Sequence, residues 1–164
     1  MTLQNQQFFI TGKIQELQTA ILHFHTDSVL KLPTSVAETL HVDEAGCLWM
    51  SVSKPSQVLN EFEKSFHVAL NYYKKGKPFF VNTYGVARLV TDPEETSQLP
   101  AQLKEEYARG KLILCVRMKE VNYYETENNY EQSFLQKCKQ RITGFFADNS
   151  NYYHVDFDEQ KYYA

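Results

Sequence analysis

The alternation of apolar and polar positions predicts many short strands and few helices. Residues 11–25 carry apolar side chains at helical spacing (Ile14, Leu17, Ala20 or Ile21, and Phe24) and predict a first helix. Strands are predicted at 28–32, 36–42, 47–52, 67–73, 78–91 and 112–124, with further helices at 57–66 and within 93–110. This order does not alternate strand and helix regularly, so it disfavours a doubly wound parallel sheet. It favours a closed or partly closed antiparallel barrel of six strands.

Turn residues separate these predicted strands. Asp43–Gly46 is an acidic turn ending in glycine, and 74–77 (KKGK) links two long strands as a hairpin. Gly85 interrupts the second of these strands and predicts a bulge or a close backbone approach. Pro100 marks a second helix start within 93–110, and Gly110 ends that segment.

The chain changes character after residue 126. Residues 127–164 are polar at first, with helical spacing around 131–141, and then rich in Phe and Tyr without a clear period. So many aromatic side chains are unfavourable in water. We therefore treat 1–126 as the barrel domain and 127–164 as a C-terminal extension that packs on the barrel or on a partner subunit.

Composition and charge narrow the classes of function. Lys and Arg number 17 against 20 Asp and Glu, so the formal net charge is −3, which argues against nucleic-acid or anionic membrane partners. The first residues show no secretory signal, and no apolar run is long enough to span a bilayer. Three cysteines without a C-x-x-C spacing suggest reduced thiols in a cytoplasmic protein.

The residue pattern does not assign a metal site or catalytic residues. His23 and His25 are two positions apart on the predicted first helix, so they face different sides and cannot share a metal ion. A catalytic triad is a spatial arrangement that spacing alone does not reveal.

One segment has the residue types for binding phosphate. Ser51, Ser53, Lys54 and Ser56 cluster where a predicted strand ends and a helix begins. Free backbone N–H groups and the positive end of a helix dipole favour an anion at such a place. The alternative is that Ser53 or Ser56 simply caps the helix.

The order of segments from 14 to 125 resembles the FMN-binding split-barrel superfamily related to pyridoxamine 5′-phosphate oxidase, in its general-stress-protein branch. The segments that carry the resemblance are 46–50 (GCLWM), 56–62 (SQVLNEF), 67–72 (HVALNY), 80–90 (FVNTYGVARLV), 91–95 (TDPEE) and 117–125. The resemblance implies a mainly β, six-stranded antiparallel split barrel. It also implies a homodimer with FMN held at the subunit interface and an oxidoreductase-like activity.

The resemblance also suggests the flavin-binding residues. Ser51 corresponds to a Thr that follows the family's Leu-Trp-Phe segment, and Ser56 to the Ser at the helix start. The candidate cofactor-binding residues are Lys31, Thr34, Ser35, Trp49, Ser51, Ser53, Lys54, Ser56 and Tyr124.

Two family cations are missing from this chain. The family's Arg-Pro-Met is replaced by residues 34–37, and its Lys by Val58. Loss of these cations would weaken charge-assisted hydrogen bonds to a phosphate. The alternative function is therefore a flavin-free dimeric binding or interaction protein of the same fold. A haem-binding relative would need an axial ligand from His23, His25 or His154.

Overall fold

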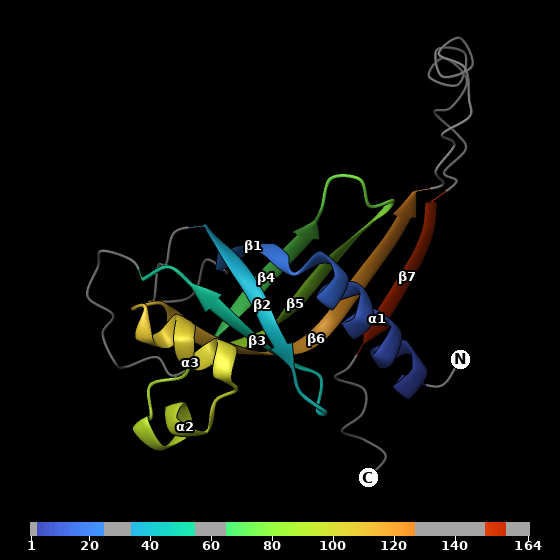
Figure 1. The fold of residues 1–164 in the computed structure, drawn as a ribbon. Helices are drawn as coiled ribbons and strands as arrows, with labels where there is room; N and C mark the ends of the chain where they lie inside the picture. The colour runs from blue at the N-terminus through green and yellow to red at the C-terminus, as the bar shows by residue number, and fades with distance from the viewer. Residues whose placement is uncertain (1–2, 25–33, 55–64, 127–149, 157–164) are drawn as a thin grey trace.

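The computed structural model describes residues 3–24, 34–54, 65–126 and 150–156 (Figure 1). Its elements in chain order are α1 (Leu3–Leu17), β1 (Thr19–Phe24), β2 (Ser35–Val42), β3 (Cys47–Val52), β4 (Ser65–Tyr73), β5 (Phe79–Leu89), α2 (Pro93–Gln98), α3 (Ala101–Ala108), β6 (Leu112–Thr126) and β7 (Ser150–Asp156). Strands dominate this part of the chain, as the sequence pattern predicts.

Six strands form a closed antiparallel barrel. The order is β3-β2-β1-β4-β5-β6, and a pairing between β3 and β6 closes the ring. Each neighbouring pair is antiparallel. The predicted fold class, a mainly β six-stranded antiparallel barrel with flanking helices, is confirmed.

The first helix lies earlier in the chain than the sequence pattern predicts. α1 ends at Leu17, Gln18 follows with a φ of 63°, and the chain continues as strand β1. Ala20 and Leu22 are buried whereas Ile21 is 48% exposed, which is a strand period of two. The helix prediction for 11–25 is therefore wrong beyond Leu17, because the spacing of Leu17, Ala20 and Phe24 does not show where a helix period gives way to a strand period.

Because of this correction, the first barrel strand comes from residues 19–24 instead of 28–32. β1 occupies the place expected for a strand at 28–32, and that segment lies outside the described residues. His23 is therefore a strand residue rather than a helix residue. The predicted helix 57–66 lies outside the described residues up to 64, while Ser65 and Phe66 belong to strand β4.

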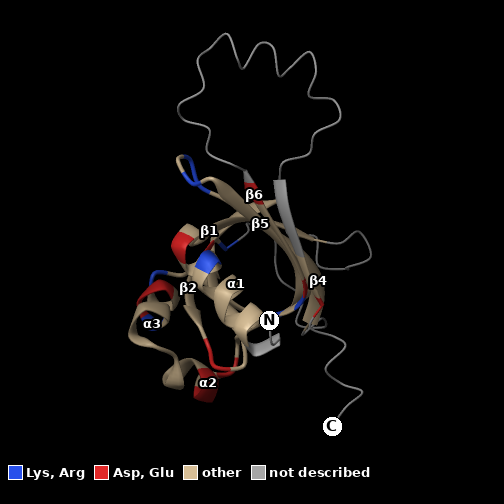
Figure 2. Ribbon diagram, turned by 90° about the vertical axis from the view of Figure 1, so that its right-hand side faces the viewer, with Lys and Arg blue, Asp and Glu red and all other residues tan. Residues whose placement is uncertain are grey.

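Helix α1 packs over one end of the barrel and contributes side chains to its core. Ile10, Ile14 and Leu17 are almost fully buried in the main core, which the inward-facing residues of the strands complete. Figure 2 shows α1 lying over the barrel between β2 and β4. Phe9 meets the ring of Tyr123 edge to face, with the centroids 5.2 Å apart. The helix therefore acts as part of the core.

The predicted turns and the bulge are confirmed. Gly46 ends the β2–β3 turn with a φ of 77°, and a Cβ there would collide with the Gln7 side chain of α1. The β5–β6 register shifts between Tyr84 and Gly85, and a Cβ on Gly85 would lie 2.4 Å from the carbonyl oxygen of Arg117. At Gly85 a side chain would meet backbone that does not move aside, whereas at Gly46 it is the positive φ that favours glycine.

Helices cover only part of the outer surface of the barrel. α3 packs over β3 and β6, and a second apolar cluster fills the space between them: Val90, Leu99, Leu103, Ile113 and Cys115. We call this the helix-covered face. The Asp92 carboxylate caps α2 by accepting from the Glu94 N–H, as expected for a strand that stops at Asp92.

The outer surface of β1, β2, β4 and β5 lacks such a cover among the described residues. Val36 is 65% exposed, Tyr73 is 68% exposed, and Ile21 lies directly opposite Val36 in the β1–β2 register. Tyr84 on β5 is 41% exposed. We call this surface the bare face, and no described helix covers its apolar side chains.

A seventh strand lies within the segment predicted as an extension. β7 pairs with 120–126 of β6, on the edge of β6 that β3 leaves open beyond residue 117. Val155 of β7 is buried in the main core. The sequence pattern did not predict this strand, because it shows no clear period. In the described part of the chain, no helix is both long and apolar enough to cross a membrane.

Candidate functional site

Five of the predicted cofactor residues lie at one end of the barrel. Thr34 directly precedes β2 and Ser35 begins it. Ser51 lies near the end of β3, and Ser53 and Lys54 follow that strand directly. The register pairs Ala37 with Val52, so the start of β2 lies beside the end of β3. The structure therefore brings these five residues to one edge of the sheet.

Ser51 is the most constrained member of this group. It is 2% exposed, and its hydroxyl has no hydrogen-bond partner among the described residues. Its strand neighbours are Glu38 on β2 and Ile113 on β6. A buried hydroxyl without a partner costs about 1–3 kcal/mol, so Ser51 weakens the fold unless something else satisfies it.

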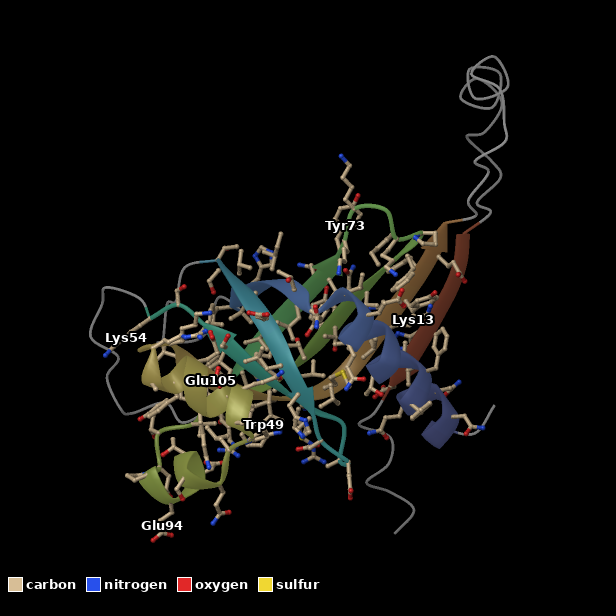
Figure 3. The ribbon with its side chains drawn as sticks, viewed as in Figure 1. Lys13, Trp49, Lys54, Tyr73, Glu94 and Glu105 are labelled. Atoms are coloured by element: carbon tan, nitrogen blue, oxygen red, sulfur yellow. The ribbon has the colours of Figure 1, made fainter. Side chains whose placement is uncertain are left out.

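The neighbouring polar residues are accessible. Ser53 and Lys54 are exposed, and Figure 3 shows Lys54 at the outer end of the molecule, far from Tyr73. The Thr34 hydroxyl lies 3.2 Å from Nδ1 of His23 on β1. Two hydroxyls and one ammonium group therefore face solvent close to the buried Ser51.

Two predicted residues already have partners or lie elsewhere. Trp49 donates its indole N–H to Oδ2 of Asp43 at 3.0 Å, and the Arg88 guanidinium lies 5.8 Å from the ring centroid. Tyr124 stacks on Phe80 near the other end of β6, with the ring centroids 4.5 Å apart. Neither side chain joins the group at the start of β2 within one chain. Lys31 and Ser56 lie outside the described residues.

Sequence reasoning missed the role of Arg88. Its guanidinium donates two hydrogen bonds to the Glu95 carboxylate, at 2.8 and 2.5 Å. This pairing lowers the pKa of Glu95 and raises that of Arg88. The charge of Arg88 is thus neutralised locally, and the ion pair links β5 to α2. The sequence 92–95 (DPEE) signals a helix start, but gives no sign of which cation it meets.

The histidines considered as haem ligands make ordinary polar contacts. His154 Nδ1 lies 2.8 Å from the Asn122 side-chain oxygen, and His23 contacts Thr34 as above. His25 lies outside the described residues. In the portions of the chain that are described, no group of three or more His, Cys, Asp or Glu residues is placed to hold a metal ion.

The donors at the start of β2 and the end of β3 suit an anion. Hydroxyl groups donate to phosphate oxygens, and the Lys54 ammonium adds charge-assisted bonds. The apolar side chains of Ile21 and Val36 lie next to this group on the bare face. The residues present therefore offer donors for an anionic group beside an exposed apolar surface.

Comparison with known proteins identifies the architecture. No family model matches the sequence, and no curated protein matches it either. Solved structures do match. One is a protein related to general stress protein 26 of B. subtilis, of the pyridoxinephosphate oxidase family, from Clostridium acetobutylicum. It is 13% identical with a TM-score of 0.59, over 95% of this chain and 97% of that chain. The chain has the split-barrel fold.

A second match is the general stress FMN/FAD binding protein from Xanthomonas citri. It is 18% identical with a TM-score of 0.57, over 81% of this chain and 96% of that chain. At these identities the split-barrel architecture is shared, and residue roles are not transferred. The resemblance predicted from the sequence is thus confirmed at the level of the fold.

Proposed function

We propose that this split-barrel protein binds FMN, with the phosphate at the start of β2 and the end of β3. The observation that carries the proposal is the buried Ser51 hydroxyl, which lacks a partner among the described residues beside exposed Ser53 and Lys54. A phosphate oxygen near this edge would satisfy that hydroxyl and offset its cost. The same fold in the Xanthomonas citri FMN/FAD binding protein supports a flavin as the ligand.

The residues described here would bind and orient the flavin. Ser51, Ser53, Thr34 and Ser35 would donate hydrogen bonds, and Lys54 would supply the positive charge. Lys31 and Ser56 remain candidate members of this group. A bound flavin would supply electron transfer, which makes the protein oxidoreductase-like in chemistry.

We also propose that the protein is a homodimer through the bare face. Exposed Ile21, Val36, Tyr73 and Tyr84 would be removed from water in such a dimer. Light scattering on the purified protein measures this oligomeric state directly.

The first test is flavin binding itself. The protein as purified should show the visible absorption of a flavin, or should quench the fluorescence of added FMN. Lys54→Ala should weaken FMN binding roughly tenfold or more, because it removes a charge-assisted hydrogen bond worth about 1.5–3 kcal/mol. Lys75→Ala is the matched control, since Lys75 is also an exposed lysine but lies in the β4–β5 turn, away from the start of β2 and the end of β3. Equal weakening by both variants would contradict a phosphate site at Lys54.

Ser51→Ala gives a second, sharper test. If the hydroxyl exists to bind phosphate, its removal should weaken FMN binding while making the flavin-free protein more stable, by up to about 1 kcal/mol. The two readouts are FMN titration and unfolding in denaturant. A variant that binds FMN as tightly as the wild type would contradict a role for Ser51.

The alternative is a flavin-free dimeric binding protein of the same fold. The absent Arg-Pro-Met and the Val at position 58 favour it, because these changes remove two cations. A colourless dimer that neither quenches FMN fluorescence nor gains thermal stability with FMN would establish this alternative. Tight FMN binding with reduction by a nicotinamide nucleotide would exclude it.

A further inference from the structure

Two thiols meet at the seam where β3 and β6 close the barrel. Cys47 lies opposite Arg117, and Cys115 lies opposite Trp49, so the cysteines are diagonal neighbours on the same outer face. Cys115 belongs to the apolar cluster under α3, and Cys47 packs against that same cluster. We propose that Cys47 and Cys115 form a reversible disulfide on exposure to hydrogen peroxide, which joins the closing strands covalently.

The two thiols differ in access, and this gives them different roles. Cys47 is half-buried, whereas Cys115 is 8% exposed and packs under α3. Peroxide therefore reaches Cys47 first, and Cys115 is the thiol that resolves the product. Because the two cysteines are diagonal neighbours on adjacent strands, the second step needs a shift of these strands and no larger rearrangement.

Burial and nearby charges set the pKa of the Cys47 thiol, and so the rate at which it reacts with peroxide. Burial and then the Asp43 carboxylate raise the pKa of the Cys47 thiol, while Arg117 and Arg88 act in the opposite direction. Burial also raises the pKa of Cys115, to about 12. Because the thiolate is the reactive form, the reaction is slow and requires sustained exposure to the oxidant.

The chemistry is balanced by hydrogen peroxide alone. The Cys47 thiolate attacks one peroxide oxygen, the O–O bond breaks, and a sulfenic acid and hydroxide form. The Cys115 thiolate then attacks the sulfur of Cys47, an S–S bond forms, and a second hydroxide leaves. The two thiol protons convert the two hydroxides to water. The sulfurs are oxidised and the peroxide is reduced.

The geometry predicts that this bond is easily reduced. Diagonal neighbours across an antiparallel ladder are roughly 7–8 Å apart, beyond the roughly 4.4–6.8 Å between the Cα atoms of most disulfides. The strands must shift slightly to allow the bond, and a strained disulfide has a more oxidising potential. Mild thiol reductants should therefore restore the reduced form.

Trp49 provides a built-in reporter. It is the chain's single tryptophan, lies opposite Cys115 on β6, and is two residues from Cys47. A disulfide quenches the fluorescence of an indole in contact with it. Formation of the Cys47–Cys115 bond should therefore reduce tryptophan fluorescence, and dithiothreitol should restore it.

The experiment uses the full chain with Cys138→Ser, so that the third cysteine cannot take part. After hydrogen peroxide, we expect the loss of two hydrogens from the intact mass, a peptide that links Cys47 to Cys115, and reversible loss of fluorescence. Cys47→Ser should abolish all three changes. Cys115→Ala should also abolish the link, while circular dichroism checks that this variant still folds.

Other outcomes would overturn the proposal. These are stable sulfinic acid at Cys47 with Cys115 still open to alkylation, disulfides between two molecules, or no change in either thiol. A loss of fluorescence that persists in Cys47→Ser would also count against it. None of these measurements depends on flavin binding, so failure of the flavin proposal would leave this test intact.

Discussion

The helix-covered face and the bare face are two outer sides of one barrel, and they differ in how far their apolar side chains are buried. Under α3 the apolar groups are buried, and charges at its edge pair within the chain, as Arg88 does with Glu95. On the bare face Val36 and Tyr73 are mostly exposed. Within the described residues, the apolar groups of the covered side are buried against a helix, whereas those of the bare side have no such cover.

Ser51 lies between these two surfaces. It is on the same side of β3 as Trp49, beside Ile113 of the covered cluster, and its other strand neighbour is Glu38 of β2. Its buried hydroxyl has no hydrogen-bond partner among the described residues. A buried polar group without a hydrogen-bond partner is a clearer sign of a binding site than the residue type alone.

The largest loss of stability should come from truncating a buried side chain of α3. Leu103→Ala, at a fully buried position of α3, should destabilise the protein by about 2–5 kcal/mol, because it leaves a cavity in the covered cluster. Chemical denaturation measures this loss. A cost below about 1 kcal/mol would mean that α3 packs loosely, and the contrast between the faces would disappear.

The strands beneath the faces give the next largest effect. Gly85→Ala should cost about 1–3 kcal/mol, because the new Cβ would meet the Arg117 carbonyl oxygen at 2.4 Å. Gly12→Ala is the control. It lies inside α1 with no atom within 4 Å of an added Cβ, so it should stabilise the protein by up to about 1 kcal/mol. Thermal unfolding of the two variants should shift in opposite directions.

The ion pair at the edge of the covered face predicts a smaller, pH-dependent effect. The Arg88 hydrogen bonds lower the pKa of Glu95 below its ordinary value of 4.5. The ionised carboxylate therefore stabilises the fold above that pH, and the contribution is lost as the pH falls through the lowered value. The side chains are 43% and 31% exposed, so solvent screening limits this contribution to less than about 1 kcal/mol.

Unfolding free energies at pH 7 and pH 3 for the wild type and Glu95→Gln test this prediction. The difference between the two proteins should be present at the higher pH and shrink at the lower one. A difference that is the same at both values would assign the effect to packing rather than to charge.

The smallest effect is expected on the bare face. Val36→Thr keeps the side-chain shape at a position 65% exposed, so stability should change by no more than about 0.5 kcal/mol in dilute protein. Val116→Thr is the buried counterpart, at 1% exposure, and should be clearly more destabilising. If the bare face forms a dimer, the cost of Val36→Thr should grow with protein concentration, which unfolding at two concentrations would show.

The sequence predicts what depends on neighbours along the chain. The acidic turn ending at Gly46, the hairpin at 74–77 and the bulge at Gly85 are all confirmed, because each is specified by local backbone requirements. The end of α1 was missed because it depends on Gln18, which adopts a positive φ that glutamine does not signal.

The site was harder to predict, because it depends on contacts between distant segments. Ser51, Ser53 and Lys54 were identified from their clustering, and the start of β2 does lie beside them. Tyr124 was assigned to the same site by resemblance alone, and within one chain it lies against Phe80 instead. The Arg88–Glu95 pair and strand β7 follow from tertiary pairing that no local pattern shows.

The way β6 is shared has a consequence for self-association. β3 pairs with 112–117 of its edge and β7 with 120–126, so one strand needs two different partners to hide a single edge. A chain cut after Thr126 would expose a row of free backbone donors and acceptors next to aromatic side chains. Such an edge is a template for strand addition by other molecules. The last strand thus protects the protein against aggregation through the long edge of β6.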